Sequence, residues 1–235
     1  MARAIPTSPA RATTRRLVVF GALALGGFAL SCIPARSDPS GLDVDLFQAG
    51  TRLPDWLDLP LRAVMQLGTI GAVLVVAVGV LLVTRRWQLP LALLAAGMLA
   101  RWGADLGKAG FERARPTEAL TGVDPRDTAG GFGFESGHTS VAFAFAAVVS
   151  WWLPRRWRPL AWTLAAAVGF ARVYVGVHYP LDVLGGAALG TALGTGVVAA
   201  AGAPRPALSS TSSVHHRGKG GEAGRRRRGA APFGD

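Results

Sequence analysis

Two histidines lie in short polar stretches beside long apolar segments. One stretch reads Arg172-Val-Tyr-Val-Gly-Val-His178-Tyr-Pro-Leu-Asp182, with His178 four positions before Asp182. If this stretch is helical, with Pro180 in the first turn, the carboxylate lies beside the imidazole and holds one ring N–H. The other ring nitrogen is then free to attack an electrophile. A structural His–Asp pair is the alternative, and this pair taken alone favours that alternative.

The second histidine, His138, stands where another apolar segment begins, in Gly133-Phe-Glu-Ser136-Gly137-His138-Thr139-Ser140. Ser136 is a suitable N-cap residue. Backbone N–H groups at a helix start, here with the flexible Gly137, form an anion site, and His138 would lie in the same first turn. Ser-Gly-His alone is a weak signal, because a helix cap followed by an interfacial histidine is common.

A basic stretch, Lys108-Ala-Gly-Phe-Glu-Arg-Ala-Arg115-Pro116, closes a third apolar segment. Arg101, Asp105 and Lys108 are spaced i, i+4, i+7 and share one helix face, so Asp105 can pair with either base. Lys108 and Arg115 then bring two cations to the same edge. For Arg113 we favour a simpler interpretation, a basic side chain that snorkels at a helix end.

Together the three stretches provide the groups that phosphoryl transfer through a covalent phosphohistidine needs. They supply three cations (Lys108, Arg115 and Arg172), a helix-start anion site, two histidines and one orienting carboxylate. Arginine and lysine can neutralise phosphoryl oxygens, so we expect neither a metal nor another cofactor.

The elements that would position these residues are predicted to be membrane-spanning helices. The chain of 235 residues is 50% hydrophobic and only 17% charged, whereas a soluble domain carries roughly 25% charged residues. A soluble alanine-rich helical protein is disfavoured because six apolar runs approach the roughly 20 residues that a helical span requires. The runs cover residues 17–33, 64–83, 89–106, 139–153, 160–175 and 181–201. The predicted fold class is therefore all-α, a polytopic six-helix transmembrane bundle.

Loop charges predict the orientation of this bundle. Arg85-Arg86, Arg155-Arg156-Arg158 and both basic termini fall on one side, which the positive-inside rule makes cytoplasmic. The other side receives loops 34–63, 107–138 and 176–180, with Trp56 as a possible interfacial anchor. We therefore expect a multi-pass plasma-membrane protein with its active site at the outer membrane–water interface.

Three regions are predicted along the chain: a basic cytoplasmic N-terminus (1–16), the transmembrane domain (17–201) and a disordered basic cytoplasmic tail (202–235). Residues 17–33 could instead form a signal peptide, but they lack a clean small-x-small cleavage site, so we predict a retained helix. Much of the net charge of +11 lies at the two ends. The tail, with Arg225 to Arg228, is expected to touch anionic lipid headgroups rather than nucleic acid. His215 and His216 in that tail are not expected to bind a metal, and the single Cys32 excludes an intrachain disulfide.

The three stretches resemble the tripartite signature of the type-2 phosphatidic acid phosphatase superfamily, which includes lipid phosphate phosphatases and bacterial undecaprenyl pyrophosphate phosphatases. That signature is Lys, six residues, Arg-Pro; then Pro-Ser-Gly-His; then Ser-Arg, five residues, His, three residues, Asp. The resemblance covers about residues 60–200. Glu135 stands in place of the usual proline and Ala171 in place of the usual serine.

The resemblance implies a role for each matching residue. His178 would be the nucleophile, Asp182 would orient it, and His138 would protonate the leaving group and then assist water. The cations Lys108, Arg115 and Arg172 would clamp the phosphoryl oxygens, helped by Ser136 and the backbone N–H of Gly137. Of the two departures, Glu135 adds negative charge beside a phosphate site and is expected either to weaken binding or to raise the pKa of His138, and Ala171 removes one hydroxyl donor.

The leading prediction is a phosphatase that hydrolyses a lipid phosphate or diphosphate. Undecaprenyl pyrophosphate, phosphatidic acid and phosphatidylglycerophosphate all remain open as substrates, because the motifs bind the phosphate and not the lipid tail. Transfer to an acceptor other than water and the oligomeric state also remain open. The alternative of another class is a non-catalytic membrane protein that binds or moves anionic lipids, and the presence together of His138, His178 and Asp182 disfavours it. A nucleic-acid binder would lose its function if residues 202–235 were deleted, whereas we expect turnover to survive that deletion.

Overall fold

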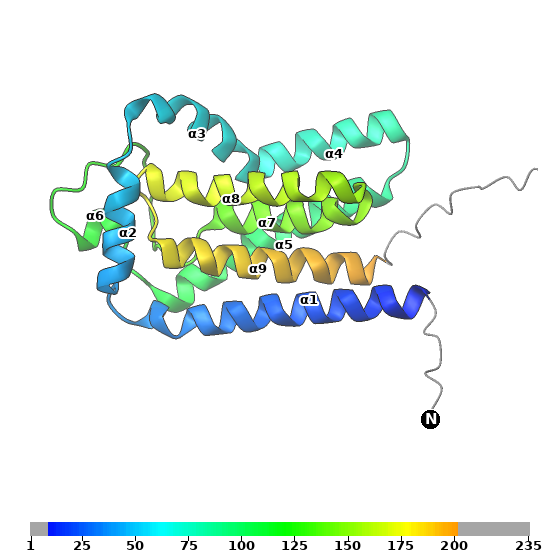
Figure 1. The fold of residues 1–235 in the computed structure, drawn as a ribbon, viewed down its shortest axis with the longest axis horizontal. Helices are drawn as coiled ribbons and strands as arrows, with labels where there is room; N and C mark the ends of the chain where they lie inside the picture. Colours follow the sequence, from blue (N-terminus) through cyan, green and yellow to red (C-terminus); the bar gives the residue numbers. More distant parts are fainter. Residues whose placement is uncertain (1–8, 202–235) are drawn as a thin grey trace, which may run out of the picture. The chain divides into compact units, whose positions relative to one another are not determined.

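Helices make up most of residues 9–201, the part of the chain that a computed structural model describes. No β-strand occurs within this range, so the predicted all-α class is confirmed. Figure 1 shows the arrangement of the helices, whose bounds are α1 Pro9–Cys32, α2 Gly41–Thr51, α3 Asp58–Met65, α4 Ile70–Thr84, α5 Gln88–Phe111, α6 Pro116–Ala119, α7 Gly137–Trp152, α8 Arg158–Tyr174 and α9 Pro180–Ala200.

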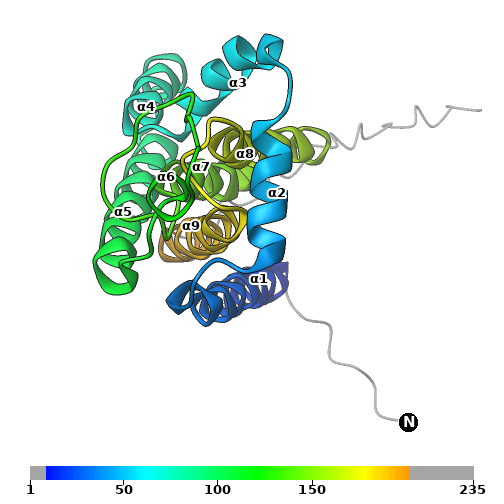
Figure 2. The ribbon, with the colours of Figure 1, turned by 90° about the vertical axis from the view of Figure 1, so that its left-hand side faces the viewer.

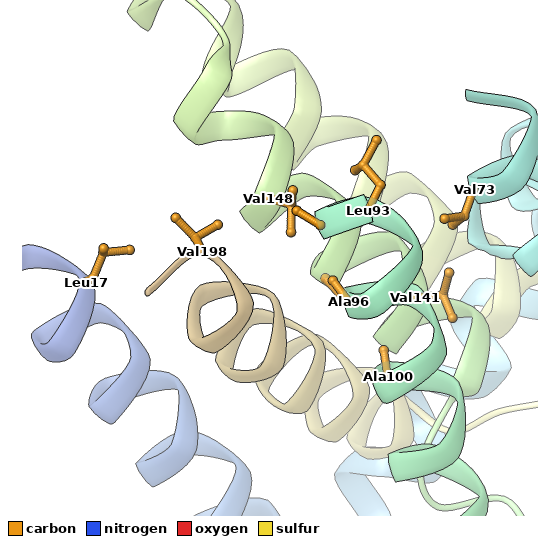
Figure 3. Close-up of a cluster of buried hydrophobic side chains, with 10 residues drawn as sticks. Leu17, Val73, Leu93, Ala96, Ala100, Val141, Val148 and Val198 are labelled. Carbon is orange, nitrogen blue, oxygen red and sulfur yellow. The ribbon is translucent and has the colours of Figure 1, made fainter. Parts of the chain in front are cut away.

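Helix α7 lies at the centre of the bundle, in contact with α5, α8 and α9. The largest group of buried apolar side chains joins α7 to α5, α9, α4 and α1, whereas Ala165 and Val168 of α8 pack on α7 in a separate group. In Figure 3, Val148 and Val141 of α7 and Leu93 of α5 lie between Val73 of α4 on one side and Val198 of α9 on the other, with Leu17 of α1 beyond Val198. The small residues Ala96 and Ala100 of α5 also face this largest group, so helices can approach closely there, as is usual for helices packed in lipid.

Helices α7 and α9 touch backbone to backbone. A Cβ atom added at Gly190 would lie 2.1 Å from the carbonyl oxygen of Ser140, and one added at Gly194 would lie 2.5 Å from that of Ala144. No side chain fits at these two positions, so glycine is required by the close approach. The same approach joins the starts of both helices, where the N–H of Ser136 donates to the carbonyl of Asp182 at 3.1 Å.

Three helical segments of the described residues are long and apolar enough to cross a membrane: 13–36, 88–119 and 180–200. Residues 55–68 and 70–84 together would form a fourth span, bent by 68°. The chain is thus a multi-pass membrane protein. Helices α7 and α8, with 16 and 17 residues, are shorter than the three single-helix segments named above, so the count of six spans stays a prediction.

The predicted run 64–83 is not one straight helix. Its first residues belong to α3 and to a 3-10 turn, Gln66–Gly68, and α4 begins only at Ile70. Thr69 is extended and its side chain accepts the N–H of Ala72, which caps α4. A Cβ atom at Gly68 would lie 2.5 Å from the carbonyl oxygen of His138, so the turn packs directly on α7 and the chain bends there.

The predicted loop 34–63 also contains the helix α2 and most of α3, which ends at Met65. In Figures 1 and 2, α2 runs across one end of the bundle, between α1 and α3. Ser40 caps α2 because its hydroxyl accepts the N–H of Asp43 at 3.2 Å. Trp56 is 74% exposed in the turn between the two helices; its role as an interfacial anchor stays a prediction.

Near the N-terminus, α1 begins at Pro9, eight residues before the predicted apolar run 17–33. It packs along α9, with Leu17 buried in the central apolar group. That α1 is kept in the mature protein, and is not cleaved off as a signal peptide, stays a prediction. Residues 1–8 and 202–235 lie outside the described residues, and with them the predicted disordered tail, His215, His216 and the Arg225 to Arg228 block.

Candidate active site

The three polar stretches converge on one cavity of about 400 Å³, at the end of the bundle where α5 ends and α7 and α9 begin. Six of the predicted site residues line it: Lys108, Arg115, Gly137, His138, Arg172 and His178. The other two, Ser136 and Asp182, are fully buried next to the lining residues Gly137 and His178. Positions up to 74 residues apart therefore share one site.

His178 occupies the turn that joins α8 to α9. Gly176, with φ +84°, allows the chain to reverse there. The ring is 2% exposed; its Nδ1 lies 3.5 Å from Oδ2 of Asp182 and its Nε2 lies 3.3 Å from Nη1 of Arg115. A guanidinium can only donate, so Nε2 must be the unprotonated nitrogen and Nδ1 carries the proton toward Asp182. The imidazole thus presents a lone pair to the phosphate-binding cations.

The His–Asp pair differs in one respect from the helix expected for it. His178 precedes α9, whereas Asp182 is the third residue of that helix, and Pro180 opens it as predicted. The carboxylate also accepts the N–H of Tyr179 at 2.9 Å. The 3.5 Å separation from Nδ1 is longer than a normal N–H···O bond, and such contacts often shorten when substrate binds.

Burial lowers the pKa of His178 to about 4, with a smaller effect in the same direction from Arg172 and Arg115, and Asp182 opposes the change. The ring is therefore neutral at pH 7. A neutral imidazole is the form that can act as a nucleophile.

The cations are held by several partners. The Arg115 guanidinium donates to three backbone carbonyls, those of Gly131 at 2.6 Å, Val177 at 2.8 Å and Gly130 at 3.1 Å. Its orientation is thus fixed before any ligand arrives, which reduces the entropy lost on binding. On α5, Asp105 lies 3.0 Å from Arg101 and 3.9 Å from Lys108, as the spacing predicted.

Arg172 already has an anionic partner. Its Nη1 lies 3.0 Å from Oδ2 of Asp127, a residue of the long connection between α6 and α7 that also lines the cavity. The side chain of Arg172 is 4% exposed. Nothing in the sequence singles out Asp127, because it lies in no motif and pairs with a residue 45 positions away.

The start of α7 is suited to bind an anion. Ser136 occupies the N-cap position as predicted, although its hydroxyl accepts from the side chain of Thr139 rather than from a backbone N–H. A Cβ atom at Gly137 would lie 3.1 Å from Nη1 of Arg101 and 3.7 Å from Nζ of Lys108. The absence of a side chain at this position leaves room for two cations beside the positive end of the helix.

Glu135 is buried completely, although it replaces the proline of the signature. Its Oε1 accepts the hydroxyl of Ser140 at 2.8 Å. Burial raises the pKa of Glu135 to about 8, against smaller effects from Ser140 and Lys108. The side chain is therefore largely protonated at pH 7 and adds less negative charge to the site than the sequence suggested. Ala171, the second departure, is buried in an apolar group with Met65 and Tyr174.

Arg113 contradicts the interpretation given to it from sequence. Its side chain is 3% exposed and forms two buried ion pairs, with Asp182 at 2.7 Å and with Asp43 at 2.7 Å. It does not snorkel, because α5 ends at Phe111 and Glu112, in the left-handed conformation with φ +46°, turns the chain inward. No spacing rule identifies Asp43, which is 70 residues away.

The chain is similar to known proteins over most of its helical part. A family model described as the PAP2 superfamily matches residues 85–205. Phosphatidylglycerophosphatase B of Bacillus subtilis (strain 168) is 30% identical over 152 residues, which cover 59% of this chain and 72% of that protein. An Escherichia coli (strain K12) protein, named provisionally as the undecaprenyl-diphosphatase YbjG, is 39% identical over 77 residues; these cover 32% of this chain and 38% of the relative.

Two solved structures have a similar fold. The crystal structure of the first transmembrane PAP2 type phosphatidylglycerolphosphate phosphatase from Bacillus subtilis matches with a TM-score of 0.67 and 24% identity, over 76% of this chain and 94% of that one. Aquifex aeolicus LpxE matches with a TM-score of 0.63 and 26% identity, over 68% of this chain and 97% of that one.

The fold and the site define a helical membrane protein whose buried histidine faces a set of phosphate-compatible cations. The family match covers half of the chain, and it includes all three polar stretches. The chain belongs to the PAP2 superfamily. The predicted resemblance and the predicted class, a membrane lipid phosphatase that hydrolyses phosphate esters, are confirmed at the level of the family.

Proposed function

We propose that this protein hydrolyses a lipid phosphate or diphosphate, of the undecaprenyl pyrophosphate or phosphatidic acid type, through a phosphohistidine at His178. One observation carries the proposal. The unprotonated Nε2 of His178 lies 3.3 Å from the guanidinium of Arg115, in a cavity that His138 also lines. A phosphoryl group bound by the cations would lie next to both imidazoles.

In the first step Nε2 of His178 attacks phosphorus and the bond from phosphorus to the leaving oxygen breaks. His138 donates a proton to that oxygen, so the lipid leaves as an alcohol, or as a lipid monophosphate if the substrate is a diphosphate. Burial, with Arg172, lowers the pKa of His138 to about 3 in the empty site, so the ring takes up this proton when the negative charge of the bound phosphate favours the imidazolium. The Nδ1–H of the phosphorylated ring faces Asp182, whose carboxylate stabilises the positive charge on the imidazole.

In the second step water attacks the phosphohistidine. His138, now unprotonated, accepts a proton from the water, the P–N bond breaks, and the electron pair returns to Nε2. Inorganic phosphate leaves and His178 is regenerated. Both steps place charge on the three non-bridging oxygens, which Lys108, Arg115 and Arg172 neutralise together with the N–H of Gly137 at the start of α7. Ser136 supports this clamp from the N-cap position of that helix, where its hydroxyl accepts the hydroxyl of Thr139.

The location of the site is part of the proposal. We place it at the outer membrane–water interface, within a six-span domain of residues 17–201 that has both termini in the cytoplasm. The basic pairs Arg85-Arg86 and Arg155-Arg156 lie in the links from α4 to α5 and from α7 to α8, at the end of the bundle away from the site (Figure 1), and support this orientation. The names of the similar proteins support a lipid phosphate or diphosphate as substrate.

The test is release of inorganic phosphate by purified protein in detergent with EDTA present. Four substrates are compared by kcat/KM: undecaprenyl pyrophosphate, phosphatidic acid, phosphatidylglycerophosphate and diacylglycerol pyrophosphate. We expect turnover of at least one substrate in EDTA, and its loss in a folded His178→Ala variant. Binding of these lipids without phosphate release would favour the non-catalytic alternative, and full activity of His178→Ala would overturn the assigned nucleophile.

A further inference from the structure

A buried chain of charges leads from the surface helix α2 to the active site. The guanidinium of Arg113 donates from Nη2 to Asp43 and from Nη1 to Asp182, each at 2.7 Å. The side chains are 3%, 7% and 0% exposed, in the order Arg113, Asp43, Asp182. Burying three charges is costly unless each one is paired and hydrogen-bonded, so this cluster needs an explanation beyond the solvation of a helix end.

The cluster fixes the backbone on which the nucleophile stands. Oδ1 of Asp43 accepts the N–H of Leu181 at 2.9 Å, and Oδ2 of Asp182 accepts the N–H of Tyr179 at 2.9 Å. These two N–H groups belong to the start of α9, directly after His178. The Arg113 guanidinium also lies 5.1 Å from the centre of the Tyr179 ring, over its face. The position of Asp182 is therefore set by residues of α2 and of the segment after α5.

The charges in the cluster do not cancel. With both carboxylates ionised and Arg113 protonated, the formal sum is one negative charge. If Arg113 faced Asp182 alone, its positive charge would offset the carboxylate that has to support the imidazole. Asp43 balances the guanidinium, so Asp182 keeps its negative charge for His178.

We infer that Asp43 and Arg113 are positioning residues, which hold Asp182 against His178 and keep its negative charge available while the phosphohistidine forms. The inference rests on the function proposed above. Neither residue lines the cavity that would bind phosphate, so both act through Asp182. The helix α2 is thereby a part of the catalytic apparatus and not only a cover on the end of the bundle.

Other charged groups also face His178 and stay unchanged in the test. Arg115 and Arg172 lower the pKa of the imidazole, His138 lines the same cavity, and Asp182 opposes the two arginines. Removing the charge of Asp43 leaves Arg113 balanced by Asp182 alone. The imidazolium is then less favoured, so the acid limb of kcat moves to lower pH. In the enzyme–substrate complex this acid limb lies at a higher pH than the pKa of His178 in the empty site, because a bound phosphate dianion favours the protonated ring.

The experiment compares Asp43→Asn with Asp43→Glu and with Asp45→Asn, a matched control on the exposed face of the same helix. For Asp43→Asn we expect kcat to fall about 10- to 100-fold, the loss that is usual for residues that orient a metal-ligating side chain from behind. KM should change by less than about twofold because no phosphate contact is lost. Asp43→Glu should recover most of kcat and the wild-type acid limb, and Asp45→Asn should match the wild type.

Each other outcome decides the matter. A loss of thermal stability with an unshifted acid limb would show a structural role only, and a rise in KM at constant kcat would place Asp43 in substrate binding; either overturns the inference.

If Asp43→Asn does not accumulate as folded protein, the Arg113→Lys variant is measured instead. A lysine at this position keeps the positive charge but cannot bridge the carboxylates of Asp43 and Asp182, so the same fall in kcat at constant KM is expected. A wild-type protein that turns over no lipid phosphate overturns the proposed function itself, whereas active wild type with Asp43→Asn equal to Asp45→Asn overturns the inference alone.

Discussion

Burial sets the protonation state and the orientation of the individual side chains in this site. His178 is neutral at pH 7 because it is 2% exposed, and Arg115 is preset by three carbonyls. Glu135 shows the same principle in a carboxyl group. Proline at that position would have no charge, and the buried Glu135 is also largely uncharged at pH 7, since burial raises its pKa to about 8.

The Glu135 side chain should make stability depend on pH. Its pKa rises from 4.5 in the unfolded chain to about 8 in the folded protein, so the folded state holds the proton more tightly. Stability from this group is complete below pH 4.5 and is lost as the pH rises to about 8. We expect Glu135→Gln, which stays neutral and can still accept from Ser140, to match the wild type near pH 5 and to exceed its melting temperature at pH 8 by about 4 °C or more.

Thermal unfolding in detergent between pH 5 and pH 9 measures this difference. Glu112→Gln, at an exposed position, is the control and should follow the wild type throughout. If the melting temperatures of the wild type and of Glu135→Gln differ by the same amount at every pH, Glu135 is ionised in the folded protein and the prediction is wrong.

The sequence predicted which motif residues would lie together, but not the ion pairs that fix their positions. The spacings within the three stretches and their common membrane side were enough to place Lys108, Arg115, His138, Arg172 and His178 at one cavity. The pairs Arg113–Asp43 and Arg172–Asp127 join residues 70 and 45 positions apart. Such pairs depend on how helices and loops fold against each other, and no local pattern encodes them.

At the level of elements, apolar runs predicted each of the long helices, because a helix in lipid must satisfy its backbone internally. Helix α2 was missed, since its residues include Asp43 and Asp45 and read as a polar loop. A local signal was present: Ser40 precedes Asp43 by three positions, the spacing at which a serine caps a helix. The bend before α4 was also missed, because it depends on contact between Gly68 and the backbone of His138.

The contact between α7 and α9 is the element-scale feature most sensitive to substitution. At Gly190 a Cβ atom would lie 2.1 Å from a backbone oxygen of α7, whereas at Gly196 on the same helix nothing lies within 4 Å. We expect Gly190→Ala to cost about 1–3 kcal/mol through overpacking. It should also lower kcat, because separating the helices moves Asp182 away from the start of α7.

Gly196→Ala is the matched control, and it should keep wild-type melting temperature and turnover. Melting in detergent and phosphate release are measured for both variants. Equal stability of the two would show that α7 and α9 can separate without cost, and would contradict the close packing described for them.

For the whole molecule, membership of the PAP2 superfamily is established by the match over residues 85–205, and the orientation in the membrane is our proposal. Cys32 is the only cysteine, so single-cysteine labelling is simple. In a Cys32→Ser background, Thr121→Cys lies in the connection beside the site and Thr84→Cys lies at the end of α4, both at exposed positions.

A membrane-impermeant maleimide applied to intact cells tests the orientation. We expect it to label the Thr121→Cys variant directly and the Thr84→Cys variant only after the membrane is permeabilised. The reverse pattern would place the site in the cytoplasm and would reject the positive-inside assignment.

The central claim is that His178 becomes phosphorylated during turnover. The most direct measurement is rapid acid-free quenching of the enzyme with a lipid substrate labelled in its terminal phosphate, followed by peptide mapping. We predict a phosphoryl group on nitrogen of His178, stable in base, lost in acid and absent from folded His178→Ala. Label on any other residue, or continued turnover by His178→Ala, would contradict the account.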